Sequence, residues 1–187
     1  IRDRFGMAYT QDESYYILDA MAGSHVYLGV RTGVNKDDMV RDLERAAAGE
    51  IRFPDGAYVN RLPVDKHDHV HIPAGTVEIS ATPYVFTFKL WDWDRVGLDG
   101  IPRPTHVEHG ARNILTSRDT ELCATRLIDR AADPHQNLSS QEGVVEEHTG
   151  LNELEFIETR RHWFTRSARL ECHDSVNVLN LVEGGSA

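Results

Sequence analysis

Short runs rich in β-branched and aromatic residues recur along the chain and predict a mainly β protein. Two runs, residues 14–20 and 25–30, flank a Gly/Ser turn and predict an antiparallel strand pair. Further strands are predicted in "YVNRLPV", "HVHIPAGTV" and "EISATPYVFTFKLWDWDR", which Pro and Gly punctuate. Many short strands of this kind are typical of a β-sandwich or a β-barrel.

One segment, residues 35–48, has helical spacing instead. Asn35 is placed to cap a helix, acidic residues fill its first turn, and Gly49 is a natural stop. One apolar stripe is predicted from Met39, Val40, Leu43 and Ala47. We therefore expect a helical insertion here, and "EHGARNIL" predicts a second, short helix.

Three regions follow from these patterns. Residues 1–117 are expected to form a partial barrel that contains the helical insertion. Residues 118–149 are polar and weakly periodic, which predicts a loop or linker. Residues 150–187 regain strand character and predict the start of a second β segment, in which "VNVLNLVEGG" reads as a final strand.

Charge and composition exclude some classes of binding partner. The 187 residues include 20 Lys+Arg and 30 Asp+Glu, so the net charge is −10 with neutral histidines. An acidic chain argues against a nucleic-acid partner, because the phosphate backbone is also negative. No apolar run is close to the length of a membrane helix, which needs about 18 residues or more. Cys123 and Cys172 lie far apart, which predicts two buried thiols in a reducing compartment. We therefore expect a cytoplasmic protein with neither nucleic acid nor membrane as partner.

Histidines are the first candidates for chemistry, because the chain has ten of them. In "KHDHVHIP", a strand would point His67, His69 and His71 to one side. Imidazole nitrogen suits zinc, iron, copper or nickel, so a metal site is one hypothesis, and an iron-dependent oxygenase is a variant of it. The alternative is a turn followed by a strand whose histidines are exposed or singly hydrogen-bonded, because ligands from one strand are usually too far apart for all three to share one ion.

Two further groups are candidates. Glu13 opens a predicted strand, where a carboxylate can ligate a metal or remain a solvated surface group. "KLWDWDR" places Lys89 and Arg95 beside two tryptophans. Cations beside aromatic rings are typical of sugar or phosphate binding, and the alternative is a strand end with salt bridges.

Taken in order, several strings resemble a known family. "DESYYILDA", "VYLGV…GV", "LPV…HDHVHIPAGTV", "EISATPYVFTFKLWDWDR" and "HVEHGARNI" are similar in order and spacing to the bacterial type I mannose-6-phosphate isomerases of the cupin superfamily. The resemblance covers residues 1 to about 115, and the later strings resemble a second β segment of longer members. It implies a cupin-like jelly-roll barrel and a chain that is a fragment of a longer one.

The resemblance also implies a zinc site. Family members hold one zinc ion with a Gln-x-His pair, a Glu and a later His. Glu13 falls on the Glu ligand, and the Gln-x-His pair would precede Ile1. Glu78 stands where the later His is expected. Either Glu78 replaces that histidine, or a short hairpin carrying it is missing, and we favour the second explanation.

The implied activity is the interconversion of mannose 6-phosphate and fructose 6-phosphate through a zinc-assisted enediol. Lys89 falls on the catalytic cation, which would stabilise the developing oxyanion. Arg95 and Arg31 would hold the 6-phosphate. Because only Glu13 of the implied ligands is present, we expect this chain alone to be inactive. The alternative is a non-catalytic cupin that binds a sugar phosphate.

Overall fold

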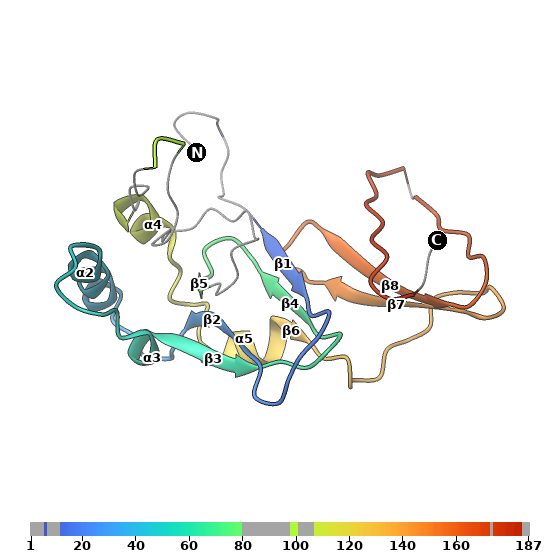
Figure 1. Ribbon diagram of the computed structural model, residues 1–187, viewed down its shortest axis with the longest axis horizontal. Helices are drawn as coiled ribbons and strands as arrows, with labels where there is room; N and C mark the ends of the chain where they lie inside the picture. The colour runs from blue at the N-terminus through green and yellow to red at the C-terminus, as the bar shows by residue number, and fades with distance from the viewer. Residues whose placement is uncertain (1–5, 7–11, 80–97, 101–106, 173, 185–187) are drawn as a thin grey trace.

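Antiparallel strands form the larger part of the regular structure, in two three-stranded sheets and a hairpin (Figure 1). The computed structural model describes residues 6, 12–79, 98–100, 107–172 and 174–184. One sheet has the order β1–β4–β6, the second has the order β3–β2–β5, and β7 pairs with β8. The strands are β1 (Glu13–Tyr16), β2 (His25–Val30), β3 (Val59–Pro63), β4 (His69–Ile72), β5 (Glu78–Ile79), β6 (Ile128–Asp129), β7 (Val144–Leu151) and β8 (Glu158–Phe164).

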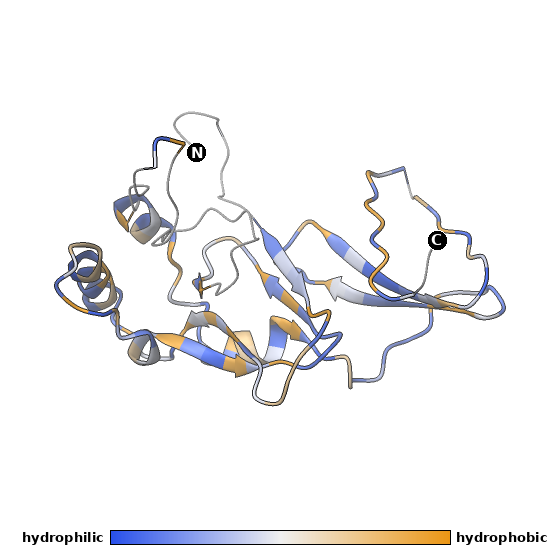
Figure 2. Ribbon diagram, in the orientation of Figure 1, coloured by the Kyte–Doolittle hydropathy of each residue, from blue (hydrophilic) through white to orange (hydrophobic). Residues whose placement is uncertain are grey.

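The two three-stranded sheets share a hydrophobic core. Leu28 of β2 packs in one buried cluster with Val70 and Ile72 of β4 and with residues of β6 and the segment before it. Hydrophilic and hydrophobic residues alternate along β4, as Figure 2 shows. The apolar residues of β4 therefore face the core, and its two histidines face the other side of the sheet. All four residues of β4 are buried, so this other side is covered as well.

The described part of the chain has four short helices, α2 (Lys36–Ala47), α3 (Asp55–Tyr58), α4 (Val107–Asn113) and α5 (Thr120–Arg126). Of these, α2, α3 and α4 contribute to a second buried cluster, whereas α5 packs in the first. Met39 and Leu43 of α2 pack against Val30, Val107 and Ile114. No helix among the described residues has both the length and the apolar character needed to cross a membrane.

The predicted helical insertion is confirmed. The Asn35 side chain accepts hydrogen bonds from the backbone N–H groups of Asp37 and Asp38, and α2 starts one residue after it. The apolar stripe is correct except at its end, where Ala46 is buried and Ala47 is exposed. Local capping and helical periodicity therefore sufficed to place this element.

A β-bulge in β2 lies between the two buried clusters, because Leu28 belongs to the first cluster and Val30 to the second. Tyr27 pairs with Arg61 and Val30 pairs with Val59, so Leu28 and Gly29 together face Asn60. Gly29 has a positive φ of 65°, and a Cβ there would lie 2.4 Å from the carbonyl oxygen of Arg118. Only glycine fits this position without strain. The bulge turns the Gly29 N–H towards the carbonyl of Val77, which brings the start of β5 against β2.

The strand pairing differs from the predicted hairpin between residues 14–20 and 25–30. β1 pairs with β4, and β2 pairs with β3 and β5, so the two strands lie in different sheets. The segment between β1 and β2 is long enough to carry the chain from one sheet to the other. Two strands that follow each other in sequence therefore need not pair. The structure bears out a mainly β fold with antiparallel sheets and little helix. Closure into a jelly-roll barrel stays a prediction.

Two boundaries also differ from the sequence prediction. Residues expected in a linker form α5 and β6, and β6 joins the first sheet beside β4. This segment is held by Cys123, Leu127 and Ile128, which lie in the core. Towards the end of the chain, "VNVLNLVEGG" forms no strand within residues 174–184, and its large apolar side chains are exposed.

Candidate functional site

Glu13 lies at the end of β1, beside the turn that follows β4. It pairs with Ile72, the last residue of β4, and therefore projects from the same face of the sheet as the Ile72 side chain. Ile72 belongs to the core between the two sheets, so Glu13 points into the space that the sheets share. The preceding residue, Asp12, fixes this arrangement, because its Oδ1 accepts a hydrogen bond from the Ala74 N–H at 2.8 Å.

Glu78 enters the same space from the second sheet. It pairs with Leu28, which is fully buried in the shared core, and so projects from the same face of β2–β5 as that side chain. Glu78 Oε1 is withdrawn from solvent, and so is the hydroxyl of Thr76, which has no hydrogen-bond partner. Glu13 and Glu78 therefore flank the Pro73–Val77 turn, one at each side. We call Glu13, Thr76 and Glu78 the turn site.

The donor chemistry of the turn site can be compared with what zinc requires. Zinc in a catalytic site takes three protein ligands and one open position. No group of three or more His, Cys, Asp or Glu residues is arranged to hold a metal ion within the described ranges. Glu13 and Glu78 supply at most two carboxylates, so the described residues by themselves do not fit zinc.

The histidines of "KHDHVHIP" are on the opposite side of the sheet from Glu13. His69 and His71 are buried, and their rings stack with centroids 4.9 Å apart and an interplanar angle of 1°. His67 lies in the turn before β4 with a positive φ of 71°, so it does not continue the row. The hypothesis that all three share one metal is wrong, because no three His, Cys, Asp or Glu side chains of the described residues, these histidines included, are placed to hold an ion. The iron-oxygenase variant of that hypothesis fails for the same reason.

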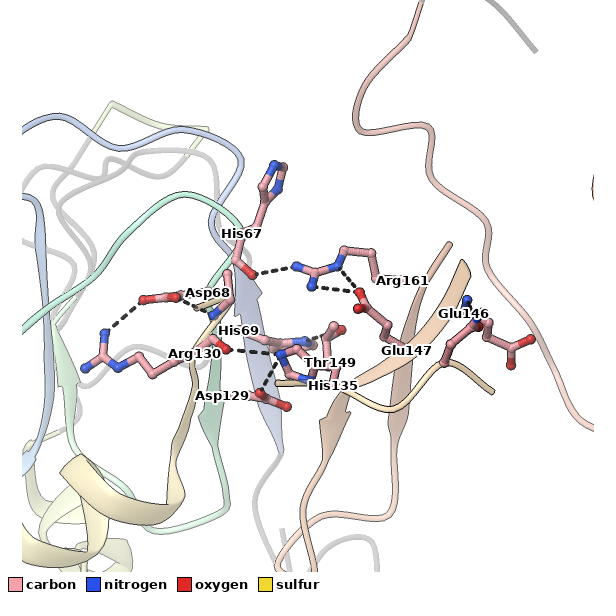
Figure 3. Close-up of polar contacts among 12 residues, drawn as sticks. His67, Asp68, His69, Asp129, Arg130, His135, Glu146, Glu147, Thr149 and Arg161 are labelled. Atoms are coloured by element: carbon pink, nitrogen blue, oxygen red, sulfur yellow. Dashed lines mark hydrogen bonds and ion pairs between the residues drawn. The ribbon is translucent and has the colours of Figure 1, made fainter. Parts of the chain in front are cut away.

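The hairpin β7–β8 covers these histidines with polar groups. His71 Nδ1 lies 2.9 Å from Glu155 Oε2, and the Glu155 side chain is buried. Its other oxygen, Oε1, accepts a hydrogen bond from the Ile72 N–H at 3.0 Å. Figure 3 shows the neighbouring contact of His69 with Thr149, which measures 3.4 Å from Nδ1 to Oγ1. Burial, with the charge of His71, lowers the pKa of His69 to about 4.

The predicted cations do not all lie within the described residues. Lys89 and Arg95 fall in residues 80–97, outside the described ranges, so their catalytic and phosphate-binding roles stay predictions. Arg31 follows β2, is exposed, and donates a hydrogen bond from Nη1 to the carbonyl of Gly56 at 2.6 Å. This contact directs the Arg31 side chain to α3. Its role in binding phosphate also stays a prediction.

Sequence reasoning missed two polar groups that the structure makes prominent. Glu155 is 84 residues from His71 in sequence, so no local spacing could link them. Thr76 looks like an ordinary turn residue in "PAGTV", and only its burial without a partner distinguishes it. The two cysteines also differ from the prediction in part. Cys123 is buried, but Cys172 is exposed, and both are free thiols.

Comparisons with known proteins give one structural likeness. No protein-family model matches the chain, and no curated protein matches it. Among solved structures, the mannose 6-phosphate isomerase from Bacillus subtilis is similar in fold, with a TM-score of 0.48 and 14% sequence identity. The likeness covers 82% of this chain and 46% of that chain, so this chain spans less than half the length of that protein.

Proposed function

We propose that this chain belongs to an aldose–ketose isomerase that interconverts mannose 6-phosphate and fructose 6-phosphate, with the turn site as part of its sugar-binding pocket. The observation that carries the proposal is the placement of Glu13 and Glu78. Both carboxylates face the space between the sheets, and both adjoin the Pro73–Val77 turn. The sequence resemblance selects the same glutamate, Glu13, independently of the structure.

The turn site offers the groups that a sugar requires. Carboxylates accept hydrogen bonds from hydroxyl groups, and the Thr76 hydroxyl can both donate and accept. A buried hydroxyl without a partner is costly, and a ligand hydroxyl would satisfy it. A carboxylate beside the bound sugar can also move a proton between C1 and C2, as an enediol mechanism demands. In this proposal Lys89 stabilises the oxyanion, and Arg95 and Arg31 bind the phosphate.

A coupled activity and binding measurement tests the proposal. The purified chain is mixed with mannose 6-phosphate, with and without added zinc, and fructose 6-phosphate is measured over time. Binding is measured by calorimetry on the same samples. Glu13→Gln keeps the shape of the side chain and removes its charge. Because this chain alone is expected to be inactive, the primary readout is binding, and we expect the substitution to weaken the binding of mannose 6-phosphate by about 10-fold or more. Any turnover that is observed should fall by about 100-fold. Glu44→Gln is the matched control, because Glu44 is exposed on α2.

The outcomes separate two functions. Turnover in the unchanged chain would support the isomerase if it is lost in Glu13→Gln and kept in Glu44→Gln. Binding of mannose 6-phosphate without turnover, with or without zinc, would instead support a non-catalytic cupin that binds a sugar phosphate. This second function is favoured by the donor set, because no three His, Cys, Asp or Glu side chains within the described ranges are placed to hold a metal ion. If the chain neither turns over nor binds mannose 6-phosphate at millimolar concentration, both proposed functions are refuted.

A further inference from the structure

The hairpin β7–β8 docks on the β1–β4–β6 sheet through polar contacts. Tyr16, His69 and Asp129 are paired across the three strands and so share the face that the hairpin covers. From β8, Arg161 Nη1 lies 3.3 Å from the Tyr16 hydroxyl. The same nitrogen lies 3.3 Å from the His67 carbonyl oxygen, a contact that Figure 3 shows. From β7, Thr149 contacts His69. This docking surface lies on the opposite face of the sheet from the core, and the turn of the hairpin reaches the core only through Leu154.

His69 is the most tightly enclosed polar group of this surface. It is 1% exposed, and its Nε2 is buried without a hydrogen-bond partner. The backbone of β7 lies directly against its ring, because a Cβ added at Gly150 would be 2.6 Å from His69 Cε1. A proton on this nitrogen would therefore create a buried charge with no acceptor among the described residues.

The charged groups around His69 are already engaged elsewhere. On β4, His71 pairs with Glu155, and the stacked His71 ring disfavours a second positive charge. On β6, the Asp129 carboxylate lies 3.6 Å from His135 Nε2, and burial raises the pKa of Asp129.

From the hairpin, the Arg161 guanidinium pairs with Glu147 at 2.8 Å. From β1, Tyr16 presents the edge of a ring to His69. Each of these carboxylates thus has another nitrogen group as its partner, namely His71, His135 or Arg161, and none is paired with His69.

We propose that the β7–β8 hairpin is a pH-sensitive arm that detaches from the β1–β4–β6 sheet when His69 is protonated. In the docked state, burial holds the pKa of His69 at about 4, against an ordinary value of 6.5. A lowered pKa means that docking is fully favourable above pH 6.5 and weakens as the pH falls towards 4. Linkage between these two values predicts that the docking equilibrium falls roughly 30-fold between pH 7.5 and pH 5. Detachment would separate His71 from Glu155, which lies in the turn between β7 and β8, and would uncover both histidines of β4.

Hydrogen–deuterium exchange on the intact chain tests the arm. Exchange is compared at pH 7.5 and pH 5.0 after correction for the intrinsic pH dependence of amide exchange. We expect amides of residues 144–151 and 158–164 to lose protection about 30-fold at pH 5.0. Amides of β2 and β3 report global unfolding and should keep their protection.

Two substitutions make the test specific. His69→Gln cannot be protonated and should remove the pH dependence of exchange in the hairpin. His69→Phe keeps an aromatic ring beside His71 and serves if the glutamine variant does not fold. His25→Phe is the matched control, because His25 lies near the surface on β2, and it should leave the pH dependence intact.

Three results would overturn the proposal. Hairpin exchange could be the same at both pH values after correction. The loss of protection could persist in both His69 variants. Finally, β2 and β3 could lose protection together with the hairpin, which would indicate global acid unfolding.

Discussion

Asn60 holds the β-bulge of β2 in place, and its loss should destabilise the whole domain. Its Nδ2 group donates to the carbonyls of Leu28 at 2.9 Å and Val30 at 2.8 Å, on both sides of Gly29. Its Oδ1 accepts a hydrogen bond from the Thr120 hydroxyl at 2.6 Å, which ties the start of α5 to the bulge. Asn60 is 5% exposed, so water cannot replace these partners.

The magnitude follows from these three hydrogen bonds. A buried hydrogen bond contributes about 1 kcal/mol net, and carbonyls left without a partner add a further desolvation penalty. Asn60→Ala should therefore lower the free energy of unfolding by at least about 3 kcal/mol. For a chain of this size that corresponds to a fall in Tm of roughly 6–12 °C. Asn60→Asp should cost more, because it sets a carboxylate oxygen against two carbonyl oxygens.

Urea unfolding followed by tryptophan fluorescence measures this loss. Asn177→Ala is the control, because the Asn177 side chain also donates to two carbonyls, those of Cys172 and Ser175, but in an exposed position. We expect the control to change stability by less than about 0.5 kcal/mol. A loss below about 1 kcal/mol in Asn60→Ala, or equal losses in both variants, would refute the role assigned to Asn60.

Two further predictions concern thiol reactivity and a buried ion pair. Burial raises the pKa of Cys123 to about 12, so this thiol stays protonated at pH 8, and iodoacetamide should modify the exposed Cys172 alone in the native protein. Equal modification of both cysteines, read by peptide mass spectrometry, would contradict this assignment. Asp68 is 1% exposed and pairs with Arg130 at 2.8 Å, so Asp68→Asn should lower the unfolding free energy by about 2–3 kcal/mol. Asp38→Asn, which removes a surface ion pair and one acidic charge in the first turn of α2, should change it by less than about 1 kcal/mol in the same urea titration.

The candidate site could be predicted only in part. Glu13 was selected by the strings around it, and the structure places it beside the Pro73–Val77 turn. Its relation to Glu78 depends on two sheets meeting, because Glu13 is fixed by β4 and Glu78 by β2. The strand period correctly places His69 and His71 on one face, but it does not reveal which element covers that face. The contact with Glu155 depends on a hairpin far along the chain.

Local features of the sequence by themselves determined the helix that begins after Asn35, the strand at His25–Val30 and the stop at Gly49. Each depends on interactions within a few residues, namely capping, side-chain periodicity and the freedom of glycine to adopt a positive φ. Only the tertiary structure decided that β1 pairs with β4, that the segment after Asp119 enters the core, and that the β7–β8 hairpin covers His69. The physical reason is that burial of apolar surface and pairing of buried polar groups join residues distant in sequence, and many alternative pairings satisfy the same local pattern.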